Sequence, residues 1–264
     1  MNFSKKKNIK ILIIGKNSFL AKNYYKYSVL KKKITLIRNT EINEIDYKKY
    51  SHLINFSYDK RIKYQNYNET NLIDEKICNL INNKKLIYIY PSSRAVFKIN
   101  KERKFYGKNK KIIENKIKIS RNKKYLILRI SNVLGFYLKG SNLFISKLLN
   151  SLKKLNIIKL DLNKKVYKDF ITIYYFSKCL DALILKNATG EYNLSSGIKI
   201  NVYELCKSII KGFGKGKIIY LSKLYTDSFV LNNSKLKKNT RLSLSKKEIL
   251  EYGYLLGKEL KKNA

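Results

Sequence analysis

The sequence predicts an α/β protein built on a doubly wound parallel sheet, with a small carboxyl-terminal α/β lobe. Two observations predict the sheet. Its strands are short and continuously apolar, which is typical of strands buried on both faces. A helical stretch is expected between successive strands, and this order favours parallel pairing with right-handed crossovers. The expected strands are residues 10–14, 34–37, 53–56, 86–90 and 125–130, and the expected helices are residues 19–30, 71–81 and 106–119.

The chain length allows a sheet domain and a second, smaller lobe. With 264 residues, the chain is long enough for one large domain or for a domain with a small addition. After residue 135 the regular alternation of strands and helices loosens into a mixture of short elements. No Pro- or Gly-rich linker marks a boundary. We therefore expect residues 1–135 to form the sheet domain, and residues 136–264 to form mainly a lobe that packs on it and can interleave with it.

The formal net charge of +40 would ordinarily suggest nucleic acid or an anionic membrane as a partner. Only seven of the 58 basic residues are Arg, however, and the lysines are spread along the whole chain. Proteins that read nucleic acid cluster Arg for bidentate contacts. Lys, Ile, Asn and Tyr are abundant, and their codons are rich in A and T. We interpret the charge as drift in an AT-rich genome, and do not expect nucleic acid as the partner.

Several classes of site are disfavoured by composition. Cys78, Cys179 and Cys206 form no CxxC pair, and His52 is the single histidine, so we expect neither a metal site nor a His-based catalytic triad. The longest apolar run, near residues 11–14, is far shorter than the roughly 20 residues that a membrane span needs. The amino terminus lacks the apolar region of an export signal. The expected location is cytoplasmic.

A glycine turn follows the first strand directly and opens the first helix. It begins at Gly15 and continues through Ser18 to Ala21, with the latter two as small replacements for further glycines. Such a turn can bring a pyrophosphate close to backbone N–H groups at a helix amino terminus. Arg38 and Asn39 end the second strand, where an acidic residue selects NAD and a cation suits a 2′-phosphate. An ordinary strand-to-helix turn and a surface arginine are the alternative interpretation.

A serine, a tyrosine and a lysine follow the fourth strand. Ser93 lies at the strand end, and Tyr106 and Lys110 are spaced i and i+4, which places them on one face of a helix. A lysine cation stabilises a phenolate, so that the tyrosine can exchange protons, and a serine hydroxyl can hold the reacting oxygen. With 22 tyrosines, such spacing also arises by chance. The position of Tyr106, after the serine-bearing strand, favours the catalytic interpretation.

The order of these motifs resembles the NAD-dependent epimerase/dehydratase family, the extended short-chain dehydrogenase/reductases. The resemblance implies a Rossmann-type fold and a nucleotide-sugar substrate. Its motifs are weak individually, but they occur in the family's order between residue 11 and about residue 205. The segments that carry it are residues 11–21, 53–57, 68–71, 91–97, 105–114, 128–135, 168–171 and 190–194.

By matched position, the resemblance implies a role for each candidate residue. Tyr106 would be the catalytic acid/base, Lys110 its partner and a contact of the nicotinamide ribose, and Ser93 the residue that orients the substrate oxygen. Asn132 and Lys168 would contact the diphosphate of the substrate. The expected cofactor contacts are Gly15, Ser18, Phe19, Leu20, Arg38, Asn39, Ser57, Asn71, Tyr106 and Lys110.

Departures from the family pattern narrow the expected reaction. Arg94 and Ala95 follow Ser93, where the 4,6-dehydratases of the family carry an Asp-Glu pair, so dehydration is disfavoured. Arg38 favours NADP(H), with NAD(H) as the compatible alternative, and therefore a reductase ahead of an epimerase. The glycine turn is degraded, the interval from Ser93 to Tyr106 is short, and two tyrosines replace the Asp-rich pair expected near residue 174.

A non-catalytic relative is the competing interpretation. It would bind a nucleotide, RNA or a protein complex as a scaffold. The degraded glycine turn and the positive charge favour it, whereas the retained serine, tyrosine and lysine argue for an enzyme, since a scaffold needs none of them. The resemblance is also compatible with a homodimer.

Overall fold

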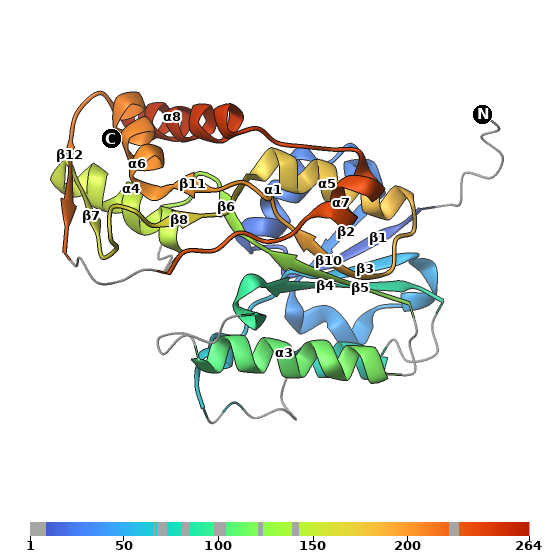
Figure 1. Ribbon diagram of the computed structural model, residues 1–264. Helices are drawn as coiled ribbons and strands as arrows, with labels where there is room; N and C mark the ends of the chain where they lie inside the picture. Colours follow the sequence, from blue (N-terminus) through green and yellow to red (C-terminus); the bar gives the residue numbers. More distant parts are fainter. Residues whose placement is uncertain are drawn as a thin grey trace. The chain divides into compact units, whose positions relative to one another are not determined.

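The computed structural model describes residues 9–65, 67, 73–80, 85–97, 104–120, 124–138, 143–221 and 227–263 (Figure 1). The chain forms two compact units. The first comprises Met1–Ile130 and Ser177–Leu194, and the second comprises Ser131–Phe176 and Ser195–Ala264. The chain therefore leaves the first unit after its fifth strand, returns to it for one helix and one strand, and then completes the second unit.

A six-stranded parallel sheet forms the centre of the first unit, with the order β10-β5-β4-β3-β1-β2 (Figure 1). The five strands predicted from continuous apolar runs are confirmed, and most of their side chains are buried. The sixth, β10, was not predicted as a strand. The strands are β1 (Ile11–Ile14), β2 (Ile34–Ile37), β3 (His52–Asn55), β4 (Ile87–Ser93), β5 (Tyr125–Ile130) and β10 (Gly190–Leu194).

The winding of this sheet reverses between β1 and β3. Strand β1 pairs with β2 on one side, aligning Ile14 with Ile37, and with β3 on the other, aligning Ile14 with Asn55. The later strands β4, β5 and β10 then extend the sheet beyond β3. In doubly wound sheets a ligand crevice forms outside the carboxyl ends of the strands at such a reversal. A ligand crevice is therefore expected at the carboxyl ends of β1 and β3.

Helices cover both faces of the sheet (Figure 1). On one face, α2 (Ile73–Leu80) and α3 (Lys104–Ile119) bury Ile77, Ile113 and Ile117 against the strands. On the other face lie α1 (Phe19–Tyr27) and α5 (Ile173–Leu185), of which Ser177 onward belongs to this unit. These two helices are joined by Asp181, which accepts hydrogen bonds from Tyr24 (2.7 Å) and Ser28 (2.6 Å).

The prediction of a helix between β2 and β3 is wrong, because the structure has 3₁₀ turns there. Two 3₁₀ turns, Asn39–Glu44 and Tyr47–Lys49, make this connection instead of an α-helix. The segment contains short polar side chains that bond to the local backbone, as Asp46 does to the Lys48 N–H at 3.1 Å. Such bonds compete with helical hydrogen bonds, so the segment forms turns.

The second unit combines short strand pairs with longer helices. The strand pairs are β6 (Asn132–Leu134) with β9 (Phe170–Thr172), β7 (Ile157–Leu160) with β12 (Lys217–Tyr220), and β8 (Tyr167–Lys168) with β11 (Ile200–Asn201). The helices are α4 (Phe144–Leu155), α6 (Val202–Phe213), α7 (Ser234–Thr240) and α8 (Lys246–Lys262). Among the residues described in either unit, no helix is both long and apolar enough to cross a membrane.

Helices α6 and α8 pack with their backbones in direct contact. A Cβ atom added to Gly257 would lie 2.0 Å from the carbonyl oxygen of Ile209, and one added to Gly212 would lie 1.9 Å from that of Tyr254. The expected mixture of short helices and strands does not include a helix as long as α8, which has 17 residues. Ser245 and Glu248 form a capping box at its start, and this box stabilises the first turn.

Candidate active site

The candidate site lies along the carboxyl edge of the sheet in the first unit. Arg38 follows β2, Gly15 follows β1, Ser57 follows β3 by two residues, and Ser93 ends β4. These four strands are neighbours in the sheet, in the order β4-β3-β1-β2. Because parallel strands end at the same edge, the fold aligns four of the predicted site residues along one side of the sheet.

Gly15 must be glycine for two reasons. Its φ of +89° lies in the left-handed region, and a Cβ there would lie 2.5 Å from the Ser57 backbone nitrogen. The N–H groups of Gly15 and Lys16 both donate to the carbonyl of Ile37 at 3.0 Å. The turn is therefore held tightly between the ends of β2 and β3, although the sequence keeps only one glycine of the family's motif.

Ser18 caps the helix that the turn opens. Its backbone is extended, and its Oγ accepts a hydrogen bond from the Ala21 N–H at 3.1 Å. Phe19 and Leu20 form the first turn of α1 directly behind it. The small replacement at position 18 thus retains a well-formed helix amino terminus beside Gly15, which is the feature that attracts a phosphate group.

Arg38 and Asn39 are exposed at the end of β2. The Arg38 N–H donates to the Glu41 carboxylate at 2.9 Å, which fixes the backbone where the 3₁₀ turn begins. This hydrogen bond uses the backbone N–H of Arg38, and its side chain is exposed.

Ser57 is held by a network that sequence reasoning missed. Its N–H (3.0 Å) and its hydroxyl both donate to the Asn55 side-chain oxygen. The Asn55 amide nitrogen in turn donates to Asp74 at 2.6 Å, and the Tyr88 hydroxyl donates to the same carboxylate oxygen at 2.6 Å. Asp74 therefore fixes which way the amide faces. The one signal in the sequence was an acidic residue in a helix that packs on the sheet. Asn71, the predicted contact nearby, lies outside the described residues.

Ser93 caps the 3₁₀ turn Arg94–Val96, because its Oγ accepts a hydrogen bond from the Ala95 N–H at 3.2 Å. The amino-terminal turn of α3 rests on this turn. A Cβ added to Gly107 would lie only 2.3 Å from the Ala95 carbonyl oxygen, so only glycine allows the approach. Tyr106 directly precedes Gly107 on α3, so the helix that carries Tyr106 contacts the turn that Ser93 caps.

Gly107 had no predicted role. The signal for it was a glycine near the start of a helix, where it is less favourable than alanine by about 1 kcal/mol and so needs a packing reason.

Lys110 lies one helical turn after Tyr106 and is buried. Its ammonium donates to the Pro91 carbonyl at 3.0 Å and lies 4.4 Å from the centroid of the Tyr90 ring. Tyr106 is half-buried and packs against the core between α3 and the sheet. The predicted tyrosine and lysine therefore lie on the face of α3 that contacts β4, the strand that ends at Ser93.

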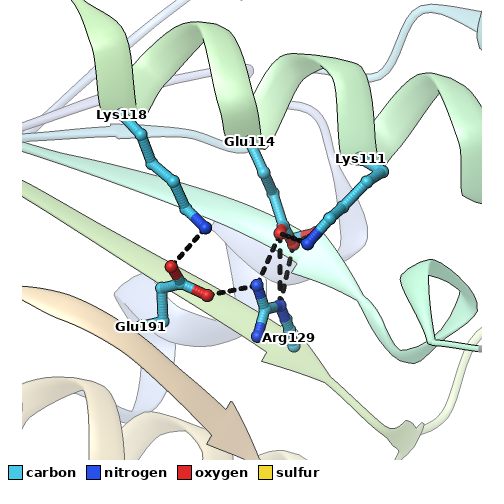
Figure 2. Close-up of polar contacts among 6 residues, drawn as sticks. Lys111, Glu114, Lys118, Arg129 and Glu191 are labelled. Atoms are coloured by element: carbon cyan, nitrogen blue, oxygen red, sulfur yellow. Dashed lines mark hydrogen bonds and ion pairs between the residues drawn. The ribbon is translucent and has the colours of Figure 1, made fainter.

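A buried carboxylate anchors α3 further along (Figure 2). Glu114 is fully buried and accepts hydrogen bonds from Arg129 Nε (3.0 Å) and Nη2 (2.7 Å), and from Ser92 Oγ (2.6 Å). Lys111 lies 3.6 Å from the same carboxylate. One side chain of α3 is thus bound to both β4 and β5. This fixes the helix that carries Tyr106 next to the residue that precedes Ser93.

Arg129 also pairs with Glu191, which in turn pairs with Lys118 (Figure 2). Burial alone would lower the pKa of Arg129, but its hydrogen bonds and ion pairs with the two glutamates outweigh that effect and raise it. Burial opposes ionisation of Glu191 too, yet Lys118 and Arg129 hold the pKa of its carboxyl below the usual range. The network therefore stays charged and also includes β10.

Asn132 and Lys168, the predicted diphosphate contacts, both belong to the second unit. The Asn132 amide donates to the Asp169 carbonyl at 3.0 Å. The Lys168 ammonium donates to the Asp227 carbonyl (2.7 Å) and carboxylate (3.0 Å), and both residues are buried. Asp169 is buried as well, and burial raises the pKa of its carboxyl. Lys168 is thus engaged in a buried ion pair, which sequence reasoning did not predict.

His52 is a core residue of β3. It is 1% exposed, its Nδ1 lies 2.9 Å from the Ser51 hydroxyl, and burial lowers the pKa of its imidazole to about 4. Throughout the described ranges, no three His, Cys, Asp or Glu residues gather into a group able to hold a metal ion.

Comparisons with known proteins identify the fold. No family model and no curated protein matches the sequence. Solved structures do match. UDP-N-acetylglucosamine 4-epimerase from Methanobrevibacter ruminantium, in complex with UDP-N-acetylmuramic acid, is 15% identical and has a TM-score of 0.79, over 98% of this chain and 100% of that chain.

Two further structures cover this chain nearly completely. dTDP-glucose 4,6-dehydratase from Bacillus anthracis, in complex with NAD, is 15% identical with a TM-score of 0.75, over 96% of this chain and 98% of that chain. RMD from Pseudomonas aeruginosa, complexed with NADPH, is 13% identical with a TM-score of 0.74, over 97% and 100%. The chain therefore has the Rossmann-type fold of the NAD-dependent epimerases and dehydratases, the extended short-chain dehydrogenase/reductases.

Proposed function

We propose that the chain is an NAD(P)-dependent enzyme that reduces or epimerises a nucleotide-activated sugar. The observation that carries the proposal is the close approach of Gly107 to the turn capped by Ser93. It supports a common site for Ser93, Tyr106 and Lys110. A scaffold has no chemical need for a serine, a tyrosine and a buried lysine on two packed elements, so this arrangement favours an enzyme over a binding module.

In this proposal Tyr106 exchanges a proton with the reacting oxygen of the sugar. Its hydroxyl donates the proton when a ketone is reduced and accepts one when an alcohol is oxidised. The Ser93 hydroxyl binds the same oxygen and orients it. The positive charge of Lys110 stabilises the deprotonated state of the tyrosine. The nicotinamide, when bound, supplies or takes up the hydride.

The residues at the reversal of the sheet fit a dinucleotide. The Gly15 turn leads into the capped amino terminus of α1, which suits a pyrophosphate. Arg38 is exposed at the end of β2, where a 2′-phosphate would be bound, so we propose that NADP(H) is preferred to NAD(H). This preference supports a reductase, and the structural similarity to a 4-epimerase keeps epimerisation as the second candidate.

The structural neighbours support the proposed substrate class. The epimerase and the dehydratase described above are named for sugars carried on UDP and dTDP. We propose a nucleotide sugar for this chain as well, and we keep Asn132 and Lys168 as proposed contacts of its diphosphate. For Lys168 this requires that the substrate share or replace Asp227. A homodimer and a cytoplasmic location remain predictions, and sedimentation velocity tests the first of them.

A direct test compares ligands under one set of conditions. Thermal unfolding is measured with NADPH, NADH and a panel of nucleotide sugars, and hydride transfer is followed by the absorbance of the reduced nicotinamide. The proposal expects NADPH to raise the melting temperature and at least one nucleotide sugar to be turned over. If the chain ignores every dinucleotide but binds RNA tightly at physiological salt, the scaffold interpretation replaces it.

A further inference from the structure

Tyr90 is a tyrosine whose hydroxyl the fold does not use. It lies on β4, is 1% exposed, and its hydroxyl has no hydrogen-bond partner within the described part of the chain. A buried hydroxyl without a partner destabilises a protein, and phenylalanine would fill the same space without that loss. Burial raises the pKa of Tyr90 well above its ordinary value, so the residue stays a neutral phenol. What the fold uses is the ring.

The ring of Tyr90 faces the ammonium group of Lys110. The distance from Nζ to the ring centroid is 4.4 Å, and the same ammonium donates to the carbonyl of Pro91, the next residue of β4, at 3.0 Å. Lys110 is only 9% exposed, so its charge depends on partners inside the protein. Tyr90 and Pro91, two consecutive residues of β4, therefore both contact the ammonium group of Lys110.

The other titratable groups near Tyr90 come from three directions. Asp74 approaches from α2, Tyr106 and Glu114 from α3, and Tyr67 from the preceding loop, and each of them acts on Tyr90 electrostatically. Asp74 and Glu114 are bound by other partners, as described above. Lys110 is thus the charged group that lies over the face of the Tyr90 ring, while the two carboxylates bind other partners.

We propose that Tyr90 is a positioning residue, which holds the Lys110 ammonium through a cation–π contact one helical turn from Tyr106. Its catalytic meaning rests on the proposed function, because only an enzyme needs the lysine charge beside the tyrosine. The placement of the lysine is independent of activity and is tested separately. An aromatic ring attracts a cation more strongly when both are shielded from water, as they are here.

The experiment measures how well Lys110 is protected. Brief acetylation with limited acetic anhydride, followed by peptide mass spectrometry, compares Lys110 with Lys108, an exposed lysine of the same helix. Tyr90→Leu and Tyr90→Met remove the ring, and Tyr90→Phe restores it without the hydroxyl. Tyr47→Leu is the matched control, since Tyr47 is buried in the same core and its hydroxyl bonds to the Ile42 carbonyl.

In the unchanged chain and in Tyr90→Phe, Lys110 is expected to react more slowly than Lys108. In Tyr90→Leu and Tyr90→Met, the relative rate at Lys110 is expected to rise by about 2- to 30-fold, the range of a cation–π contact from exposed to desolvated. Tyr47→Leu is expected to lower the melting temperature without changing the ratio. An unchanged ratio in both ring-free variants overturns the positioning role.

Turnover separates this proposal from the proposed function. With a nucleotide-sugar substrate, the ring-free variants are expected to shift the pH–rate profile to higher pH and to lower kcat more than they change KM, and Tyr90→Phe is expected to restore both. A chain that turns over no nucleotide sugar, yet shows the expected labelling, refutes the proposed function and leaves the positioning role supported. Turnover with unaltered labelling and pH profile in the ring-free variants refutes the positioning role alone.

Discussion

Glu114 and Arg129 form a bidentate ion pair that binds helix α3 to strand β5, with nitrogen–oxygen distances of 3.0 and 2.7 Å. Glu114 is fully buried, and Arg129 is 9% exposed. Removing one partner of such a pair leaves an uncompensated buried charge. This loss destabilises the protein by more than the intact pair stabilises it. The pair therefore holds α3, the helix that carries Tyr106, against β5.

We predict that Arg129→Met lowers the free energy of unfolding by about 3–5 kcal/mol. Without Arg129, Glu114 keeps Ser92 and Lys111 as its partners among the described residues. Glu191→Gln is the matched control, because that side chain is 31% exposed and should change stability by less than about 1 kcal/mol. Urea unfolding measures both, and equal losses in the two variants would contradict the assignment.

His52 predicts how stability depends on pH. Its pKa is about 4 in the folded protein and 6.5 ordinarily, so the unfolded chain binds a proton first as the pH falls. Stability is therefore lost between pH 6.5 and pH 4, and the full effect is about 3 kcal/mol. His52→Leu is expected to flatten the decline above about pH 5, where most carboxylates are still ionised.

The same group can be observed directly, since the chain has one histidine and so one set of imidazole C–H signals in the proton spectrum. We predict a titration midpoint well below the ordinary histidine value. A midpoint near 6.5 in the folded protein would show that His52 is not shielded as described.

The proposed preference for NADP(H) rests on Arg38. We predict that NADPH binds more tightly than NADH, and that Arg38→Asp lowers this ratio by roughly 10-fold or more, since a charge-assisted contact to the 2′-phosphate is lost and a repulsion added. Lys33→Asp is the control, because Lys33 is exposed just before the amino end of β2 and undergoes the same charge change. Equal dissociation constants for both cofactors, unaffected by Arg38→Asp, would remove the basis for a preference.

The contact between α6 and α8 makes a prediction about glycine. Gly257→Ala would add a Cβ 2.0 Å from the Ile209 carbonyl oxygen, so the helices must separate, at a cost of about 1–3 kcal/mol. In Gly253→Ala the nearest atom is the flexible end of Leu205, at 2.8 Å, and the gain in helix propensity offsets part of the crowding. Thermal unfolding should show a clearly larger loss for Gly257→Ala, and the reverse order would contradict the backbone contact.

How much of the fold the sequence predicts depends on the burial of each strand. Strands such as β1 and β5 are buried on both faces and read as continuous apolar runs, so they could be located. Strand β10 lies at the edge of the sheet and alternates polar and buried residues, among them Glu191, so it lacked that signal. The prediction of a helix after β2 failed for another reason, because the polar side chains of this connection stabilise local turns in place of a helix.

The candidate site divides in the same way. Gly15, Ser93, Tyr106 and Lys110 belong to local motifs, and the sheet order then aligns their elements. The contacts that hold these elements join residues further apart in sequence, such as Glu114 and Arg129, and they form only where α3 packs on the paired strands β4 and β5. The Asp74 network and the Tyr90 ring likewise depend on which strands are neighbours, and no spacing rule reveals them.

The most direct test of the account is the turnover of Tyr106→Phe with the nucleotide sugar that the unchanged chain converts. The substitution keeps the ring that packs against the core and removes the proton, so the melting temperature and the dissociation constant of NADPH should hardly change. We predict that kcat falls by about 10²–10⁴-fold, the contribution of a positioned acid or base. Turnover within about twofold of the unchanged chain would show that Tyr106 is a packing residue and not the proton donor.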